Sequence, residues 1–269
     1  MRFRLLWHAV TVETDEPALV GELECVLASA EHPMAAARTQ QYRVQTQQDG
    51  LAISEEGDLL ALVSGAQEAR DAIHERSHRR AFELADLQGW LMLRGALVDV
   101  GERRLLLLGP PGAGKTILTL RLGLRGAAIQ GDDRVLFRHG QLLALPRPLA
   151  VPDDAGELVP ELAAIVSELP RAGGPALLDP ARALGLPWQL RIARADHVVA
   201  LERTGTQTSA SPCAGVELLG ELGAALAPAR DLTPELVAAF AALLQSASGH
   251  RLSVGDPDTA ERAIRAIAC

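Results

Sequence analysis

Eight consecutive residues near the middle of the chain have the types and the spacing of a phosphate-binding loop. They are Gly109, Pro110, Pro111, Gly112, Ala113, Gly114, Lys115 and Thr116, which fit the pattern G-x-x-x-x-G-K-[ST]. Glycines in such a loop allow successive backbone N–H groups to surround phosphate oxygens, the lysine reaches the β- and γ-phosphates, and the threonine hydroxyl faces Mg²⁺. A leucine run at residues 105–108 precedes the motif and a helical pattern follows it, which is the context that the motif requires. The pattern therefore predicts a site for a metal-bound triphosphate.

The lysine of this motif is the only lysine among the 269 residues, and all the other residues in the Lys and Arg count are arginine. An ammonium group is a compact charge on a flexible stem, whereas a guanidinium group is planar and favours two-pronged contacts. The use of lysine at this one position supports phosphate binding over a glycine-rich turn that only joins a strand to a helix.

A pair of acids, Asp132 and Asp133, follows Lys115 by 17 residues, at the end of a strand that is predicted at residues 127–130 and expected to be adjacent to the strand before the loop. The carboxyl ends of strands in an open α/β sheet face the ligand. We therefore expect both carboxylates at the γ-phosphate and Mg²⁺, one at the metal and the other accepting a proton from an attacking hydroxyl. The alternative interpretation is a polar turn in which aspartate caps the backbone.

Composition limits the classes of partner and compartment. The net charge is −8 with both signs interspersed, which argues against a nucleic-acid scaffold held by non-specific electrostatics. Cys25, Cys213 and Cys269 are odd in number and scattered, so we expect a reducing cytoplasm and neither a disulfide framework nor a zinc site. No apolar run reaches the length of a signal peptide or a membrane span, so we expect a soluble cytoplasmic protein without a membrane partner.

Residues 1–90 are predicted to form a small α+β unit. The patterns indicate strands at residues 3–12, 42–46, 51–54 and 59–63 in an antiparallel meander, and helices at residues 18–30, 66–80 and 85–93. The helix at 66–80 carries Arg70, Arg76, Arg79 and Arg80 among acids, either as a solvated face with intrahelical pairs or as a surface for an acidic partner. His74 and His78 are spaced as in a zinc helix, but no third ligand follows at motif spacing, which disfavours a metal there.

Residues 91–269 are predicted to form a second domain around the phosphate-binding loop. The expected strands are 97–100, 104–108, 127–130, 134–137, 142–145, 197–201 and 251–254, and the expected helices are 117–124, 158–169, 216–226, 233–247 and 256–267. Residues 151–187, rich in Pro, Gly and Ala, and the polar stretch 205–213 are expected to include long loops, the first of them mobile and facing the substrate.

The order of motifs between residues 93 and 148 resembles a known family. A strand, the phosphate-binding loop, a helix closed by Arg125–Gly126, a strand and Asp132–Asp133–Arg134–Val135 follow one another. This order is similar to the catalytic domain of HPr kinase/phosphorylase and its shorter relatives, which include lasso-peptide kinases. The resemblance implies a phosphoenolpyruvate-carboxykinase-like P-loop fold of the α/β class, a mixed sheet flanked by helices, and ATP-dependent phosphorylation of a serine hydroxyl on a peptide or small protein.

The same resemblance implies roles for individual residues. Lys115 binds phosphate, Asp132 and Asp133 supply base and metal contacts, Thr116 and Asp133 are the metal ligands, and Arg147 contacts substrate or phosphate. ATP and Mg²⁺ are the implied cofactors, and the N-terminal unit with its arginine-bearing helix is expected to recognise the acceptor. We also expect no nucleic acid and allow for a homo-oligomer.

The chain departs from the family pattern in one instructive place. Arg94–Gly95 stands where the family often has His-Gly or His-Ala, and the family members that run the reverse phosphorolysis use that histidine. The departure disfavours phosphorylase activity. HPr itself is disfavoured as the substrate for a separate reason, because the acidic Arg-Gly segment that supplies a further Mg²⁺ ligand in true HPr kinases is not found in this sequence. Two alternatives to a peptide kinase therefore stay open, namely a catalytically weak nucleotide-binding adaptor that switches a partner, and a kinase for a small metabolite.

Overall fold

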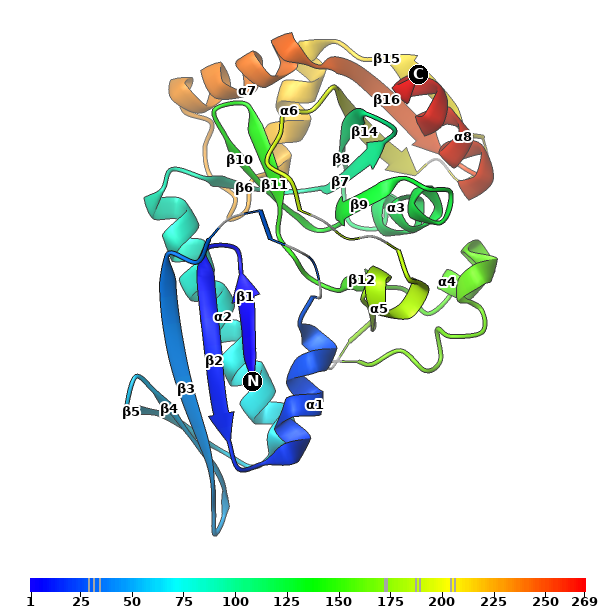
Figure 1. The fold of residues 1–269 in the computed structure, drawn as a ribbon. Coiled ribbons are helices and arrows are strands. Elements are labelled where there is room, and N and C mark those ends of the chain that lie inside the picture. The colour runs from blue at the N-terminus through cyan, green and yellow to red at the C-terminus, as the bar shows by residue number, and fades with distance from the viewer. Residues whose placement is uncertain are drawn as a thin grey trace.

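The structure is a computed structural model that describes residues 1–28, 30, 32–33, 35–171, 174–186, 188, 190–203, 205 and 207–269. It is a mixed α/β protein in which sheets are flanked by helices, and this part of the prediction is confirmed. The elements near the N-terminus gather in one half of the molecule, and the elements that follow residue 90 occupy the other half (Figure 1). No helix within the described ranges is long and apolar enough to cross a membrane.

The N-terminal half is a five-stranded sheet, ordered β1-β2-β3-β4-β5, that packs on two helices. The strands are β1 (Arg2–Leu5), β2 (His8–Thr14), β3 (Arg38–Gln47), β4 (Gly50–Glu55) and β5 (Asp58–Val63), and the helices are α1 (Pro17–Val26) and α2 (Ala66–Leu87). Alternating apolar residues of the strands, such as Val10, Val44 and Ile53, meet Leu23 and Ile73 of the helices in one core.

Two predictions for this half need correction. The apolar stretch 3–12 is a hairpin of β1 and β2 rather than one strand, because the chain turns at Leu6, whose φ is 55°. Strands β3, β4 and β5 are antiparallel as predicted, but β2 and β3 run parallel, because α1 carries the chain back between them.

The second half contains a six-stranded sheet, ordered β15-β16-β14-β8-β7-β9. Its strands are β7 (Ala96–Val100), β8 (Arg103–Leu108), β9 (Ala128–Gly131), β14 (His197–Arg203), β15 (Ser209–Pro212) and β16 (Ser248–Val254). Strands β8, β14 and β16 are mutually parallel. Because β7 is antiparallel to both of its neighbours, β9 runs in the same direction as β8.

Helices cover both faces of this sheet. They are α3 (Lys115–Leu124), α6 (Gly215–Ala225), α7 (Pro234–Ser246) and α8 (Pro257–Ala268). Leu105 and Leu107 of β8 pack in one core with α3 and α8, whereas Leu106 and Leu108 pack on the opposite face with α6 and α7. The leucine run is therefore a strand that is buried on both faces, as expected for a parallel sheet.

Two small sheets complete this half, one ordered β11-β10-β6 and one formed by β12 and β13. The elements are β6 (Leu91–Arg94), β10 (Arg134–Arg138), β11 (Gln141–Ala144), β12 (Leu149–Val151) and β13 (Ala176–Leu178), with the short helices α4 (Ala155–Leu158), η1 (Pro160–Leu162) and α5 (Pro180–Leu184). The division predicted at residue 90 falls between α2 and β6, and it stays a prediction.

Three predicted elements in this region are wrong. The helix expected at 85–93 does not form, because α2 continues to Leu87 and Gly89, with a φ of 76°, turns the chain into β6. The helix expected at 158–169 is limited to η1 and turns, and Pro160, at the first position of η1, separates it from α4 by holding Val159 in an extended conformation. Part of the polar loop expected at 205–213 is β15, which pairs with the edge strand β16.

Candidate functional site

The phosphate-binding motif connects β8 to α3 in a loop that requires glycine. Gly109 has a φ of 144°, and a Cβ atom there would lie 2.5 Å from the carbonyl oxygen of Leu201 in β14. Gly112 and Gly114 also adopt positive φ, at 80° and 96°. Gly114 is the N-cap of α3, and no side chain caps the helix. The first N–H groups of α3 are therefore available to an anion, which the positive end of the helix dipole also favours.

The Lys115 ammonium lies inside the curve of this loop. Its Nζ donates hydrogen bonds to the carbonyl oxygens of Gly109, at 2.8 Å, and of Pro110, at 3.0 Å. Burial lowers the pKa of Lys115, and the nearby carboxylates of Asp132 and Asp133 oppose that shift. The lysine thus places a positive charge where the loop would hold phosphate.

Asp132 lies at the carboxyl end of β9, beside the first turn of α3. It is 7% exposed, and its Oδ2 accepts a hydrogen bond from the Thr116 hydroxyl at 2.7 Å. Burial raises the pKa of Asp132 to about 6, with a further contribution from Asp133, while the Thr116 hydrogen bond and Arg147 act in the opposite direction. The site therefore holds a buried carboxylate whose charged form is poorly stabilised by the protein alone.

Asp133 is the more accessible member of the pair, with 46% of its side chain exposed. Its Oδ2 accepts hydrogen bonds from Nη1 of Arg147 at 2.8 Å and from Nε of Arg134 at 3.1 Å. The backbone N–H of Gly95 donates to the carbonyl oxygen of Asp133 at 3.0 Å, which ties the end of β6 to the acid pair.

These groups line a cavity of about 630 Å³. Of the predicted site residues, Gly109, Pro111, Gly112, Ala113, Gly114, Lys115, Thr116, Asp132 and Asp133 line it. Pro110 contributes its carbonyl to Lys115, and Arg147 reaches the site through Asp133. The structure brings the predicted residues together, and the roles assigned to them stay predictions.

Two details differ from the expected arrangement. The acid pair follows β9, which is separated from β8 by β7, so the two strands are not adjacent. They nevertheless point the same way, and so Asp132 and the loop share one edge of the sheet. The Thr116 hydroxyl bonds to Asp132, whereas the expected metal ligands were Thr116 and Asp133.

The cavity also contains charged residues to which the sequence analysis assigned no role. Arg203 lies at the carboxyl end of β14, and Asp154 precedes α4. Arg94 ends β6, on a segment predicted to be helical. The position of Arg203 follows the rule that strand ends face the ligand, so the predicted strand at 197–201 carried a signal for it. The family resemblance placed Arg94 at the position of the family histidine, but the helix predicted at 85–93 concealed the strand β6, whose end brings Arg94 to the cavity.

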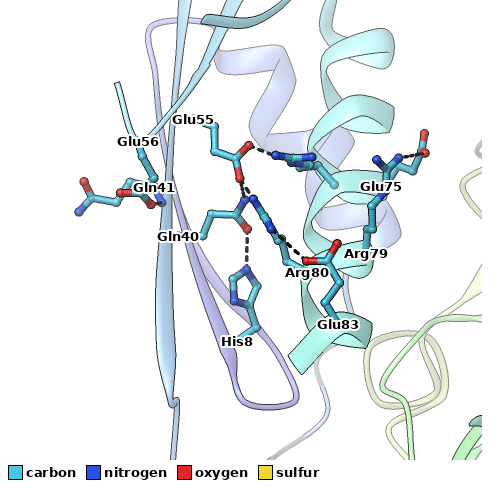
Figure 2. A network of polar contacts seen from close by, with 10 residues as sticks. His8, Gln40, Gln41, Glu55, Glu56, Glu75, Arg79, Arg80 and Glu83 are labelled. Atoms are coloured by element: carbon cyan, nitrogen blue, oxygen red, sulfur yellow. Dashed lines mark hydrogen bonds and ion pairs between the residues drawn. The ribbon is translucent and has the colours of Figure 1, made fainter. Parts of the chain in front are cut away.

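The arginine-bearing helix α2 is mostly paired with acids of its own half. Arg76 and Arg80 both contact Glu55 of β4, and Arg80 also contacts Glu83. Gln40 joins Glu55 to His8, and Figure 2 shows this chain of contacts between the sheet and α2. Arg70 is only 4% exposed and contacts Glu22 and Asp71, so it belongs to neither a solvated face nor an open partner surface.

The rings of His74 and His78 lie against one another in a tilted arrangement, with centroids 4.0 Å apart and an interplanar angle of 53°. Burial, assisted by Arg147, lowers the pKa of His74 to about 4, and burial, assisted mainly by His74, lowers the pKa of His78 to about 3. Within the described ranges no three His, Cys, Asp or Glu side chains come together as a metal site. Both histidines are therefore neutral near pH 7, and the nearby charge of Arg147 disfavours their protonation.

Comparison with known proteins adds little to this geometry. No protein-family model matches the chain, and no curated protein is similar to it by sequence. Among solved structures, the chain is similar to the HPr(Ser) kinase/phosphatase from Coxiella burnetii over 65% of this chain and 92% of that one, with 12% identity and a TM-score of 0.33. This similarity is too low to assign a family or an activity, so the function has to be inferred from the site itself.

Proposed function

We propose that the protein is an ATP- and Mg²⁺-dependent kinase that transfers the γ-phosphoryl group to a hydroxyl, namely a serine of a peptide or small protein. The observation that carries the proposal is the meeting of a phosphate-binding loop with a buried carboxylate through the 2.7 Å hydrogen bond between Thr116 and Asp132. The proposal includes a P-loop fold of the phosphoenolpyruvate-carboxykinase type and the division into residues 1–90 and 91–269.

The loop and α3 account for binding of the triphosphate. Most residues of the loop, Lys115 and the start of α3 line the cavity, and no side chain caps the first N–H groups of that helix. Together they offset the negative charge of the β- and γ-phosphates. The cavity volume of about 630 Å³ lies in the range of small-molecule sites.

The residues beside α3 fit a magnesium ion. Asp132 is buried and its pKa is raised to about 6, and a divalent cation would stabilise its charged form. A hydroxyl and a carboxylate are also the oxygen donors that Mg²⁺ prefers. We therefore assign the metal to Thr116 and Asp132, where it would neutralise charge on the transferred phosphoryl group. Asp132 thereby takes the role of metal ligand that was first expected for Asp133.

Asp133 is then the group that receives the proton. Both arginine hydrogen bonds go to Oδ2, and no described residue donates a hydrogen bond to Oδ1, which leaves Oδ1 for the acceptor hydroxyl. The acceptor oxygen forms a bond to the γ-phosphorus while the bond to the β,γ-bridging oxygen breaks. The electron pair leaves on ADP, and the hydroxyl proton passes to Asp133.

The test is transfer from γ-labelled ATP to a library of serine peptides in the presence of Mg²⁺. We expect the wild-type chain to label peptides, Lys115→Ala and Asp132→Asn to lose transfer, and the exposed control Asp58→Asn to retain it. Hydrolysis of ATP without labelled peptide, together with nucleotide-dependent capture of a partner, would instead indicate an adaptor. Label on a small hydroxyl compound alone would indicate a metabolite kinase.

A further inference from the structure

We infer that Arg94 and Arg134 form a subsite for a carboxylate, which selects acceptors that carry an acidic side chain next to the phosphorylated serine. The inference rests on the proposed kinase function and adds the charge class of its acceptor. It concerns the wall of the cavity made by β6 and β10.

The backbone places the two arginines side by side. In the antiparallel pair of β6 and β10, Arg94 lies directly opposite Arg134. Directly opposed residues share one face of a sheet, so both side chains project from the same side of this pair. Both residues line the cavity together with Asp133.

The positive charge at this wall exceeds the negative charge. Arg134 and Arg147 share one oxygen of Asp133, and Asp132 is directed to Thr116 instead. Arg94 is exposed and makes no ion pair with the described residues. Like charges directly opposed across a sheet are destabilising, so an anion bound between Arg94 and Arg134 would relieve their repulsion.

The position of this wall favours the acceptor as the source of the anion. In the proposed function the phosphates bind to Lys115, the loop and the start of α3. The end of β6 instead lies beside Asp133, because the Gly95 N–H donates a hydrogen bond to the Asp133 carbonyl oxygen. A serine whose hydroxyl reaches Asp133 has its neighbouring residues over β6 and β10. Without Arg94 and Arg134, the acid pair would repel an acidic acceptor.

The test uses three peptides with both termini blocked that differ only in the residue beside the serine, which is Asp, Asn or Lys. We expect wild-type kcat/KM to be about tenfold higher with Asp than with Asn, as for one charge-assisted hydrogen-bonded contact. Arg94→Gln should bring that ratio close to one, and Arg94→Glu should reverse the preference toward Lys. Arg138→Gln removes a positive charge from the same strand outside the cavity and should keep the wild-type ratio.

The outcomes separate this inference from the proposed function. Equal wild-type transfer to the Asp and Asn peptides overturns the subsite and leaves the kinase intact. If Arg94→Gln lowers kcat/KM for all three peptides by the same factor and raises the KM for ATP, the subsite is also overturned, because Arg94 would then bind the nucleotide. Absence of transfer to every peptide by the wild-type chain contradicts the peptide-kinase proposal first and this inference with it.

Discussion

Two buried aspartates on neighbouring strands show how differently the same residue is used. Asp99 of β7 is 2% exposed, and its two oxygens accept hydrogen bonds from Nε and Nη2 of Arg104 at 2.7 and 3.0 Å. Arg191 adds a third contact at 2.7 Å. Asp132, directly after β9, has a hydroxyl partner, Thr116, and no arginine or lysine among the described residues bonds to it.

The difference separates a structural cluster from a candidate site. The charge of Asp99 is matched by cations that link β7, β8 and the segment before β14, so the cluster holds the sheet in place. Asp132 lies at the edge of a cavity without an ion pair among the described residues, and burial raises its pKa to about 6. A buried carboxylate that lies in a cavity and has no ion pair is typical of a group that binds a cation or takes up a proton.

The largest expected effect tests the functional side of this comparison. Asp132→Asn and Lys115→Ala should each lower phosphoryl transfer by on the order of 10³-fold, because each removes charge compensation from the transferred group. Asp99→Asn, assayed at a temperature where it is folded, should keep most of its transfer. Single-turnover labelling would measure the rate of phosphoryl transfer in each variant. A comparable loss of transfer in Asp132→Asn and Asp99→Asn would contradict the distinction between a functional and a structural aspartate.

The structural side predicts the opposite order in stability. Asp99→Asn should lower the free energy of unfolding by roughly 3–5 kcal/mol, because Arg104 is left buried without its full partner. Asp132→Asn should be neutral or stabilising at pH 7, since it removes a buried charge. Denaturant titrations of both variants against the wild type measure the two values, and a large destabilisation by Asp132→Asn would show that this carboxylate is structurally required.

The pH dependence sharpens the same contrast. The folded pKa of Asp132 is raised above its usual value, so its protonation favours the folded state, and its contribution to stability is largest at low pH and is lost as the pH rises through about 6. Between pH 4 and pH 7 the free energy of unfolding of the wild type should fall by on the order of 2–3 kcal/mol relative to that of Asp132→Asn. Unfolding measured for both proteins across this range isolates the group, and parallel curves would contradict the assignment.

The smallest expected effect concerns the metal. Thr116→Val removes the hydroxyl that bonds to Asp132 and should raise the Mg²⁺ concentration for half-maximal transfer by about tenfold. Thr116→Ser keeps the hydroxyl and should stay close to the wild type. A magnesium titration of labelling compares the three, and equal metal requirements in all of them would place the ion elsewhere.

The sequence by itself determined the local frame of the site. The leucine strand, the glycine loop and α3 follow one another within residues 105–124, so their relative positions depend mainly on short-range geometry. The acid pair was recognised from its place at the end of the next strand in sequence, β9. The hairpins β7–β8, β10–β11 and β3–β4 were predictable for the same reason, since each joins consecutive strands through a short turn.

Only the tertiary structure decided how distant segments meet. The pairing of β6 with β10 places Arg94 opposite Arg134, and the contact of Asp99 with Arg191 joins residues 92 positions apart. The same is true of the choice between Asp132 and Asp133 as the partner of Thr116, because adjacent acids have identical local signals. Local sequence patterns indicate which residues can contribute to a site. Burial and contacts across the sheet decide which of the charged residues form ion pairs within the protein and which can bind a ligand.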